Sequence, residues 1–241
     1  MAKSDTQRAG AAPAAGRARS GGRRAYSVGK RGLDLLLSVL ILALAAPLWV
    51  LIALAIKVDS PGPVLFRQRR IGQGGREFVM YKFRSMVSDA DPRVHWEAFR
   101  RFAEGEPLEV DGAGPRYKAH RDPRVTRVGR LLRATNLDEV PQLLNVLRGE
   151  MSLVGPRPAI PYELEWYKDW YFQRFQVAPG ISGLWQVKSR NRVGLEEMVR
   201  QDLEYIRRRS LLLDLQIIAL TVPGMLLHPR GNGGKPAREE P

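Results

Sequence analysis

The sequence contains no cysteine and only three histidines. Without cysteine the chain can form neither a disulfide framework nor a thiolate metal site. The histidines, His95, His120 and His228, are far apart in the sequence. A histidine-based metal cluster is therefore not expected, although distant residues can still meet in a folded chain.

Acidic residues are scarce relative to basic ones. The chain has 25 Asp and Glu residues against 39 Lys and Arg residues, which gives a formal net charge of +14. Such a balance implies a polyanionic partner: nucleic acid, an anionic membrane surface or phosphorylated substrates. The length of 241 residues suits one or two domains with a sizeable core.

Two common catalytic motifs are also missing. The glycine-rich turn Gly72–Gly75 lacks the Lys and Ser/Thr of a nucleotide-binding P-loop. The sequence has no G-x-S-x-G motif, so it does not predict the nucleophilic serine of an α/β-hydrolase.

The two ends of the chain lack the apolar periodicity of folded elements. Residues 1–27 are rich in Ala, Gly, Ser and Arg and are predicted to form a disordered basic arm. A cleaved signal peptide fits poorly, because the apolar run behind this arm is too long for a signal core. Residues 228–241 are predicted to be a flexible tail.

A long apolar run is the strongest physical signal in the chain. It carries no charge from Leu35 to Ile56, which exceeds the roughly 20 residues that span a bilayer as a helix. Pro47 lies near its middle, where it tends to kink a helix. Basic residues flank both ends: Arg23, Arg24, Lys30 and Arg31 precede it, and Lys57, Arg67, Arg69 and Arg70 follow it. The positive-inside rule then leaves two interpretations: a re-entrant helix over residues 28–58 with both ends on the cytoplasmic face, or an ordinary span that tolerates its proline.

The rest of the chain, residues 59–227, predicts a membrane-surface domain of the α+β class that is mainly helical. Residues 64–66 and 78–81 are expected to form a small, basic β-hairpin around the Gly72–Gly75 turn. It is either solvated or rests against lipid headgroups. Helices are expected at 88–104, 162–175 and 195–209, with a short strand at 184–187. The apolar segment 211–227, interrupted by Asp214 and Pro223, is expected to lie in the membrane interface.

An adjacent acid pair, Asp138 and Glu139, opens a proline-containing apolar stretch. In the simpler interpretation, Thr135, Asn136 or Asp138 caps a helix that runs to Leu147 and stops at Gly149. In the functional one, an ionised Asp138 at the helix start attacks phosphorus. Arg133 and Arg157 would neutralise substrate phosphate, and Glu139 would help to hold Mg²⁺, which prefers oxygen ligands.

Several stretches together resemble one family. "KRGLDLLLSVLILALAAPLWVLIALAIKVDSPGPVLFRQRRIG", "FVMYKFRSM", "DPRVTRVGRLLRATNLDEVPQLLNVLRGEMSLVGPRP", "PGISGLWQV" and "DLEYI" are similar to bacterial sugar transferases, the monotopic polyprenyl-phosphate phosphoglycosyl transferases. The resemblance covers roughly residues 28–225. It implies transfer of a sugar-1-phosphate from a UDP-sugar to polyprenyl (undecaprenyl) phosphate with release of UMP, as the first membrane step of polysaccharide or glycoconjugate assembly.

The resemblance also implies roles for individual residues. Asp138 would be the nucleophile that forms an aspartyl-phosphosugar, Glu139 its partner, and both would bind the required Mg²⁺. Arg133 matches a phosphate-binding arginine five residues before the dyad. The family's Gly-Pro-Arg-Pro loop matches Gly155, Pro156, Arg157 and Pro158, with Arg157 on substrate phosphate. The family's re-entrant helix break matches Ala46–Pro47, although some relatives have serine where this chain has Ala46.

The resemblance further places the protein on the cytoplasmic face of the bacterial inner membrane, as a catalytic unit without a multi-helix membrane domain. Its expected partners are a UDP-sugar, polyprenyl phosphate and membrane lipids, with no nucleic acid; the sequence leaves a homo-oligomer open. Two alternatives also stay open. Asp138 could act as a general base in a direct transfer, or the chain could be a non-enzymatic basic adaptor that binds anionic lipid.

Overall fold

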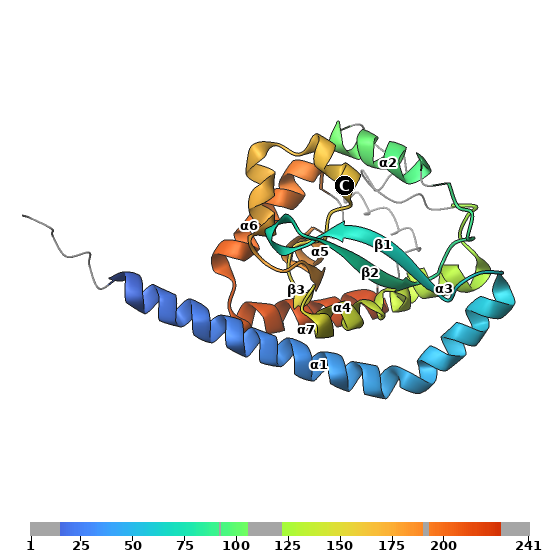
Figure 1. Cartoon of the computed structure of the whole chain (residues 1–241), viewed down its shortest axis with the longest axis horizontal. Helices are drawn as coiled ribbons and strands as arrows, with labels where there is room; N and C mark the ends of the chain where they lie inside the picture. Colours follow the sequence, from blue (N-terminus) through green and yellow to red (C-terminus); the bar gives the residue numbers. More distant parts are fainter. Residues whose placement is uncertain (1–14, 92, 106–121, 190–192, 228–241) are drawn as a thin grey trace, which may run out of the picture.

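The computed structural model describes residues 15–91, 93–105, 122–189 and 193–227, and these are mainly helical (Figure 1). The α-helices are α1 (Ala15–Asp59), α2 (Arg93–Ala103), α3 (Arg127–Thr135), α4 (Gln142–Arg148), α5 (Leu184–Lys188), α6 (Leu195–Arg208) and α7 (Leu211–Leu227). The 3-10 helices are η1 (Gln73–Gly75), η2 (Leu137–Glu139), η3 (Pro161–Trp166) and η4 (Asp169–Gln176). The strands are β1 (Leu65–Ile71), β2 (Glu77–Phe83), β3 (Ser152–Val154) and β4 (Gly180–Ser182).

Helix α1 begins earlier than predicted. It starts at Ala15, so residues 15–27 of the predicted disordered arm are helical. Alanine and arginine favour helix, and the arm extends an existing helix, so no new helix nucleus is needed. Residues 1–14 and the predicted tail 228–241 lie outside the described residues.

The apolar part of α1 is exposed rather than buried in a core. Residues 24–59 form a helix long and apolar enough to cross a membrane. Only 11% of its most apolar stretch of 18 residues is buried. Figure 1 shows α1 as a bent rod that passes beneath the other elements and turns upward in its C-terminal part. Pro47 lies inside the helix and provides the physical cause of a bend, because it removes one backbone donor and crowds the preceding turn.

The predicted hairpin is confirmed, and it is longer than predicted. Strands β1 and β2 pair antiparallel from Leu65 opposite Phe83 to Ile71 opposite Glu77. Residues 73–75 close the turn, where Gly74 and Gly75 both have positive φ, a conformation that glycine adopts without steric cost. A second, parallel pair joins β3 to β4.

Two other predicted elements differ in kind. The aromatic segment 162–175 forms η3 and η4 rather than one α-helix, with Tyr167 between them in an extended conformation. Residues 184–188 form helix α5, so the strand expected at 184–187 is wrong. The strand of this region is β4, just before it, where Gly180 packs too closely against the backbone of Gly155 for a side chain.

Three buried clusters hold the elements together. The first joins the hairpin, α4, β3, α6 and α7 through Phe78, Met80, Leu143, Val146, Met151, Leu153, Val154, Tyr205 and Ile217. The second packs aromatic residues of α2, η4 and α5 against Leu195, Met198, Val199 and Leu203 of α6. The third packs Ile52 and Ile56 of α1 against Phe83 and Leu132. Both halves of α1 therefore touch the same folded body, a point that also follows from its contacts with α4 and α3.

Candidate active site

The acid pair lies in a 3-10 turn between two helices. Asn136 ends α3 in the left-handed conformation (φ 56°), the one non-glycine residue with positive φ among those described. Asp138 is buried in the turn η2 that follows. The α-helix starts only at Gln142, with Pro141 as its N-cap residue. The predicted helix start at the dyad is thus corrected, because the left-handed residue and the proline keep the backbone out of the α-helical ladder there.

Glu139 forms an ion pair that the sequence did not predict. Lys82 on β2 donates to Glu139 Oε1 at 3.3 Å, and the two side chains are only 20% and 16% exposed. Because the pair is largely shielded from water, its attraction is stronger than that of a surface pair. The lysine lies 57 residues before its partner, so no local spacing could have predicted the pair.

Arg133 projects from the last turn of α3, before the dyad. Within the part of the chain that the structure describes, it makes no hydrogen bond or ion pair, and its side chain is half-buried. Its charge is nevertheless felt nearby. The pKa of Asp122 is lowered mainly by a hydrogen bond from Arg124, with a further contribution from Arg133. This guanidinium is therefore suited to hold an anion near the dyad.

The Gly155–Pro158 loop is a rigid connection that follows β3. Gly155 donates its N–H to Ser182 O at 2.9 Å, and Gly180 donates to Pro156 O at 2.8 Å. A Cβ added at Gly155 would lie 2.5 Å from the carbonyl oxygen of Ala178. Only glycine therefore fits the first position, and both proline rings of the loop are buried.

Arg157 is held by a fully buried acid, Glu163. Its two terminal nitrogens donate to the two carboxylate oxygens at 2.8 and 2.9 Å, a bidentate geometry. The Glu163 side chain is 0% exposed. Burial acts to raise the pKa of Glu163, but Arg157 and Arg70 outweigh it and hold that pKa below its ordinary value. The arginine predicted to bind phosphate thus has its planar group oriented by an ionised partner.

Two more buried arginines hold the backbone of this loop. Arg70 on β1 donates to Pro158 O at 2.8 Å, and Arg174 on η4 donates to Arg157 O at 3.0 Å. Arg174 also pairs with Asp202 of α6 in a fully buried contact. Burial raises the pKa of Asp202 to about 6, against the opposing charge of Arg174. Three arginines therefore surround the loop, and two of them are paired with the acids Glu163 and Asp202. These groups together leave one positive charge in excess, which favours an anionic ligand.

The two predicted halves of the site are attached to the same hairpin at different points. Lys82, which contacts the dyad, lies opposite Phe66 in the ladder, whereas Arg70, which contacts the loop, lies opposite Phe78. These two rungs are four residues apart, or roughly 13 Å at 3.3 Å per residue. The hairpin thus acts as a rigid spacer between the acid pair and the Gly155–Pro158 loop, hereafter the arginine loop.

The turn around Asp138 offers oxygen ligands for a hard cation. Within the described residues there is no cluster of three His, Cys, Asp or Glu side chains. Asp138 and Glu139 are consecutive residues of η2, and Asn136 Oδ1 is buried without a hydrogen-bond partner in the described structure. Mg²⁺ commonly uses one or two carboxylates together with substrate phosphates and water. The residues present therefore fit Mg²⁺, with Lys82 as a competitor for Glu139.

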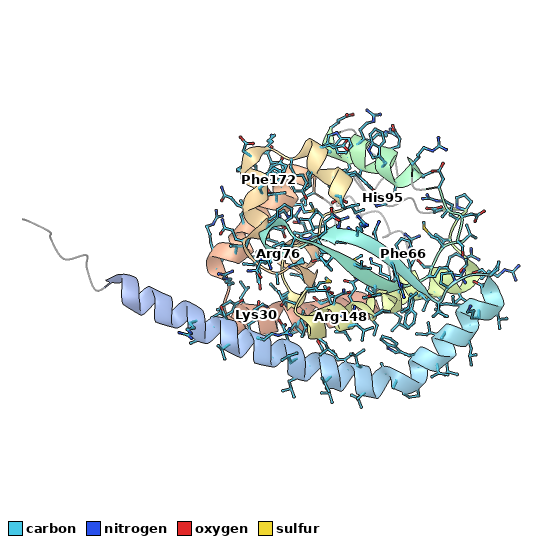
Figure 2. All side chains as sticks on the ribbon, viewed as in Figure 1. Lys30, Phe66, Arg76, His95, Arg148 and Phe172 are labelled. Atoms are coloured by element: carbon cyan, nitrogen blue, oxygen red, sulfur yellow. The ribbon has the colours of Figure 1, made fainter. Side chains whose placement is uncertain are left out.

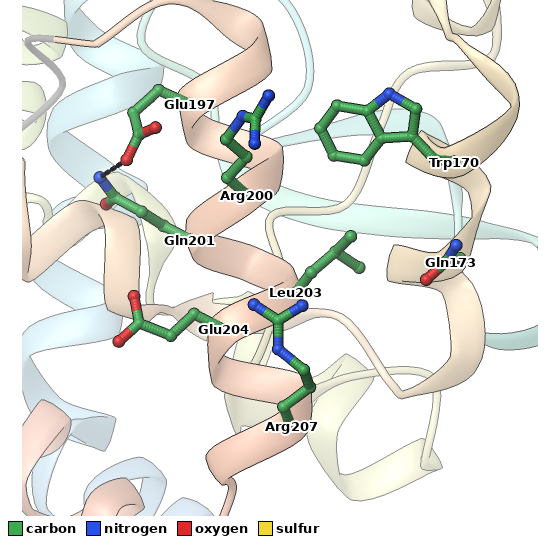
Figure 3. Close-up of a pocket in the computed structure, with 8 residues that line it drawn as sticks. All are labelled: Trp170, Gln173, Glu197, Arg200, Gln201, Leu203, Glu204 and Arg207. Carbon is green, nitrogen blue, oxygen red and sulfur yellow. Dashed lines mark hydrogen bonds between the residues drawn. The ribbon is translucent and has the colours of Figure 1, made fainter.

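The remaining predicted residues and the described pocket lie elsewhere. Ala46 and Pro47 are exposed on α1. A groove of about 560 Å³ lies between η4 and α6 (Figure 3). It is lined by Trp170, Gln173, Glu197, Arg200, Gln201, Leu203, Glu204 and Arg207. None of the predicted site residues lines this groove, so it is separate from the dyad.

Comparison with known proteins gives a consistent result. The profile of one family, described as "Bacterial sugar transferase", matches residues 25–228. The chain is 40% identical over 200 residues to the "Exopolysaccharide production protein ExoY" of Sinorhizobium fredii, a match that covers 83% of this chain and 86% of the relative.

Two further relatives carry more specific names. The chain is 43% identical over 212 residues to the "UDP-glucose:undecaprenyl-phosphate glucose-1-phosphate transferase" of Caulobacter vibrioides, covering 85% of this chain and 72% of that protein. It is 39% identical to the "Undecaprenyl-phosphate galactose phosphotransferase" of Salmonella typhimurium, covering 82% of this chain but only 40% of that protein. The sugars in the two names differ.

Proposed function

Because the chain belongs to the bacterial sugar transferase family and is a phosphoglycosyl transferase, we propose that it transfers a sugar-1-phosphate from a UDP-sugar to a polyprenyl phosphate and releases UMP. The structural observation that carries this proposal is the buried Asp138 in a tight turn beside the Glu139–Lys82 pair. A carboxylate held in such a place can act on phosphorus, and the nearby basic residues suit a diphosphate substrate.

The proposed chemistry has two displacements. An Asp138 carboxylate oxygen attacks the phosphorus that carries the sugar, and the bond between this phosphorus and the bridging oxygen breaks, so that UMP leaves with the electron pair. A phosphate oxygen of the polyprenyl phosphate then attacks the same phosphorus, and Asp138 leaves as a free carboxylate. Each step exchanges one P–O bond for another, so neither an oxidant nor a reductant is needed.

Charge neutralisation is assigned to two arginines and a metal. Arg133 and Arg157 bind the substrate phosphates, and Glu163 keeps the guanidinium of Arg157 oriented. Asp138 and Glu139 are the residues that would hold Mg²⁺. The ion would supply positive charge against the phosphate oxygens. Before the ion binds, the ion pair with Lys82 restrains the side chain of Glu139.

We further propose that α1 is re-entrant and that the enzyme lies on the cytoplasmic face. At its N-terminal side, Arg31 donates to the carbonyls of Val146 and Leu147 at 2.6 and 2.9 Å. At its C-terminal end, Arg84 donates to Ser60 O at 2.7 Å, and Asp59 accepts from Val128 N at 2.8 Å. Because both ends hold the same folded body, a straight crossing would put that body on both sides of the bilayer.

The membrane face is the outward side of α1. Its exposed residues include Leu36, Val39, Leu40, Leu44, Val50, Leu51 and Leu54. A water-soluble nucleotide sugar and a membrane-bound acceptor can meet only at an interface. A domain anchored in this way would hold the dyad there.

The decisive experiment replaces Asp138 by asparagine and measures UMP release from a UDP-sugar without lipid acceptor. We expect Asp138→Asn to lose activity by several orders of magnitude, because an amide cannot form the acyl phosphate. The matched control is Asp169→Asn, at an exposed aspartate on η4. A screen over several UDP-sugars would identify the donor.

Two outcomes distinguish the alternatives. Intact-mass detection of a phosphosugar on Asp138 with donor alone supports covalent transfer, whereas acceptor-dependent UMP release without an adduct supports a general-base role. Wild-type protein that binds anionic vesicles but releases no UMP from any donor would support the adaptor hypothesis.

A further inference from the structure

A buried acid lies at the start of the apolar helix α7. Asp214 is 1% exposed and accepts hydrogen bonds from α1, which is distant in sequence, and from α6, the helix before α7. Lys30 Nζ and the Tyr26 hydroxyl of α1 donate to Oδ2, each at 3.0 Å, and the Tyr205 hydroxyl of α6 donates to Oδ1 at 2.7 Å. Figure 2 shows Lys30 where α1 runs beside α7. A buried carboxylate with this many donors is well compensated.

This cluster, Tyr26–Lys30–Tyr205–Asp214, lies at the edge of the apolar surface. Lys30 precedes the apolar run of α1, and Asp214 is in the first turn of α7. Beyond these residues both helices expose leucines: Leu36, Leu40 and Leu44 on α1, and Leu215 and Leu220 on α7. The cluster therefore marks the level at which the molecule changes from a polar to an apolar exterior.

The same cluster reaches the backbone just before the arginine loop. The Tyr205 hydroxyl is 3.1 Å from Val154 O, so its proton is shared between this carbonyl and Asp214. Next to it, Asp34 of α1 accepts the N–H of Leu153 at 3.1 Å. Leu153 and Val154, two consecutive residues of β3, are thus held by side chains of α1 and α6. Gly155 follows them directly in the chain.

We propose that Tyr205 and Asp214 are positioning residues that fix the height of the Gly155–Pro158 loop relative to the bilayer. The inference rests on the proposed function, because it assigns the loop to a substrate phosphate. An acceptor embedded in lipid presents its phosphate at a set depth, so a small error in loop height costs rate. A donor or acceptor that is free in solution can follow the loop and is not sensitive to its height.

The test is Tyr205→Phe, which removes one hydroxyl and keeps the ring. We expect kcat/KM for a long-chain polyprenyl phosphate in vesicles to fall about 2- to 10-fold, the range for one hydrogen bond. The donor-only UMP burst and transfer to a short, water-soluble prenyl phosphate should fall by less than about 2-fold, below the lower end of that range. Tyr171→Phe is the matched control, since Tyr171 is also buried and its hydroxyl makes no hydrogen bond to the described residues.

Equal losses with both acceptors would overturn the proposal, because they would mean that the cluster only stabilises the fold. No loss with either acceptor would overturn it as well. Should Tyr205→Phe fail to fold, Tyr26→Phe removes another donor to Asp214 and is judged by the same comparison. Absence of UMP release by the wild type would instead refute the proposed function, so the two failures are distinguishable.

Discussion

Replacing Glu163 by glutamine tests how the arginine loop is held. The substitution keeps the size of a side chain that is 0% exposed and removes its charge. The amide can accept one of the two bonds that Arg157 now donates at 2.8 and 2.9 Å. Its NH₂ group would face the other guanidinium nitrogen, and two donors repel each other.

The expected loss of stability is about 3 kcal/mol at pH 7. Removing one partner of a buried ion pair costs roughly 3–5 kcal/mol because the other charge stays buried. Arg157 is 18% exposed, so water solvates part of its unpaired charge. The expected loss therefore lies near the lower limit of this range. We expect the KM for the UDP-sugar to rise as well, since the guanidinium is no longer oriented toward phosphate.

The pH dependence has a definite sign. The pKa of Glu163 is lowered in the folded state from 4.5, so the stability it supplies is present above about pH 4.5 and is lost as the pH falls through the lowered value. The difference in free energy of unfolding between wild type and Glu163→Gln should therefore be largest near neutral pH and become smaller in acid. The pKa of Asp202 is raised to about 6, but Asp202 titrates in both proteins and largely cancels in the difference.

The assay is reversible unfolding in detergent micelles, followed by tryptophan fluorescence at several pH values, together with UMP-release kinetics. Glu165→Gln is the control, because Glu165 is exposed on the same 3-10 helix, η3. The reasoning is refuted if the free energy of unfolding of Glu163→Gln at pH 7 lies within about 0.5 kcal/mol of the wild-type value, the usual range for surface substitutions. A stability gap that widens on acidification would refute it equally.

Two further substitutions test the frame around the site. Gly155→Ala should destabilise the protein by about 1–3 kcal/mol and lower UMP release, because its Cβ would lie 2.5 Å from a backbone oxygen. Gly194→Ala is its control, with nothing within 4 Å of the added carbon; similar unfolding midpoints for the two variants would contradict the packing argument. Arg84→Met should cost about 3 kcal/mol, because a buried arginine that holds carbonyls at the end of α1 is removed. Limited proteolysis after residue 57 should become faster, and an unchanged cleavage rate would contradict the role of Arg84.

Local patterns were sufficient for elements whose cause is local. The hairpin follows from a glycine turn between β-forming residues, and it formed as β1 and β2. The amphipathic helix predicted at 195–209 is α6, Leu195–Arg208. The predicted stop at Gly149 is also confirmed, since Gly149 ends α4 in the left-handed conformation with φ 81°.

The backbone conformation at the dyad could not be predicted from sequence patterns. The expected helix start became a 3-10 turn because Asn136 adopts a left-handed conformation. Asparagine tolerates this conformation but does not require it, so the sequence alone leaves it open. The strand expected at 184–187 failed for a related reason, because apolar runs this short suit strand and helix equally.

The partners of the predicted site residues, and the ion pair behind the Gly155–Pro158 loop, were also hidden from the sequence. Lys82 and Glu139 are 57 residues apart, and Arg174 and Asp202 are 28 residues apart. Such pairs are set by the way elements pack, and one sequence holds no periodic signal for them. Arg157 and Glu163 are closer in sequence, but they lie on a loop and a 3-10 helix, where spacing does not indicate which side chains meet.

The attachment of both ends of α1 to one body has a consequence for how the protein enters its membrane. In the proposed re-entrant arrangement, Lys30 and Arg31 at one end of α1 and Lys57 at the other would stay on the same side of the hydrocarbon. A membrane potential of 100 mV does about 2.3 kcal/mol of work on each elementary charge that crosses. No charge crosses in this arrangement, so the potential contributes no net work to insertion. The protein should enter de-energised vesicles as readily as energised ones.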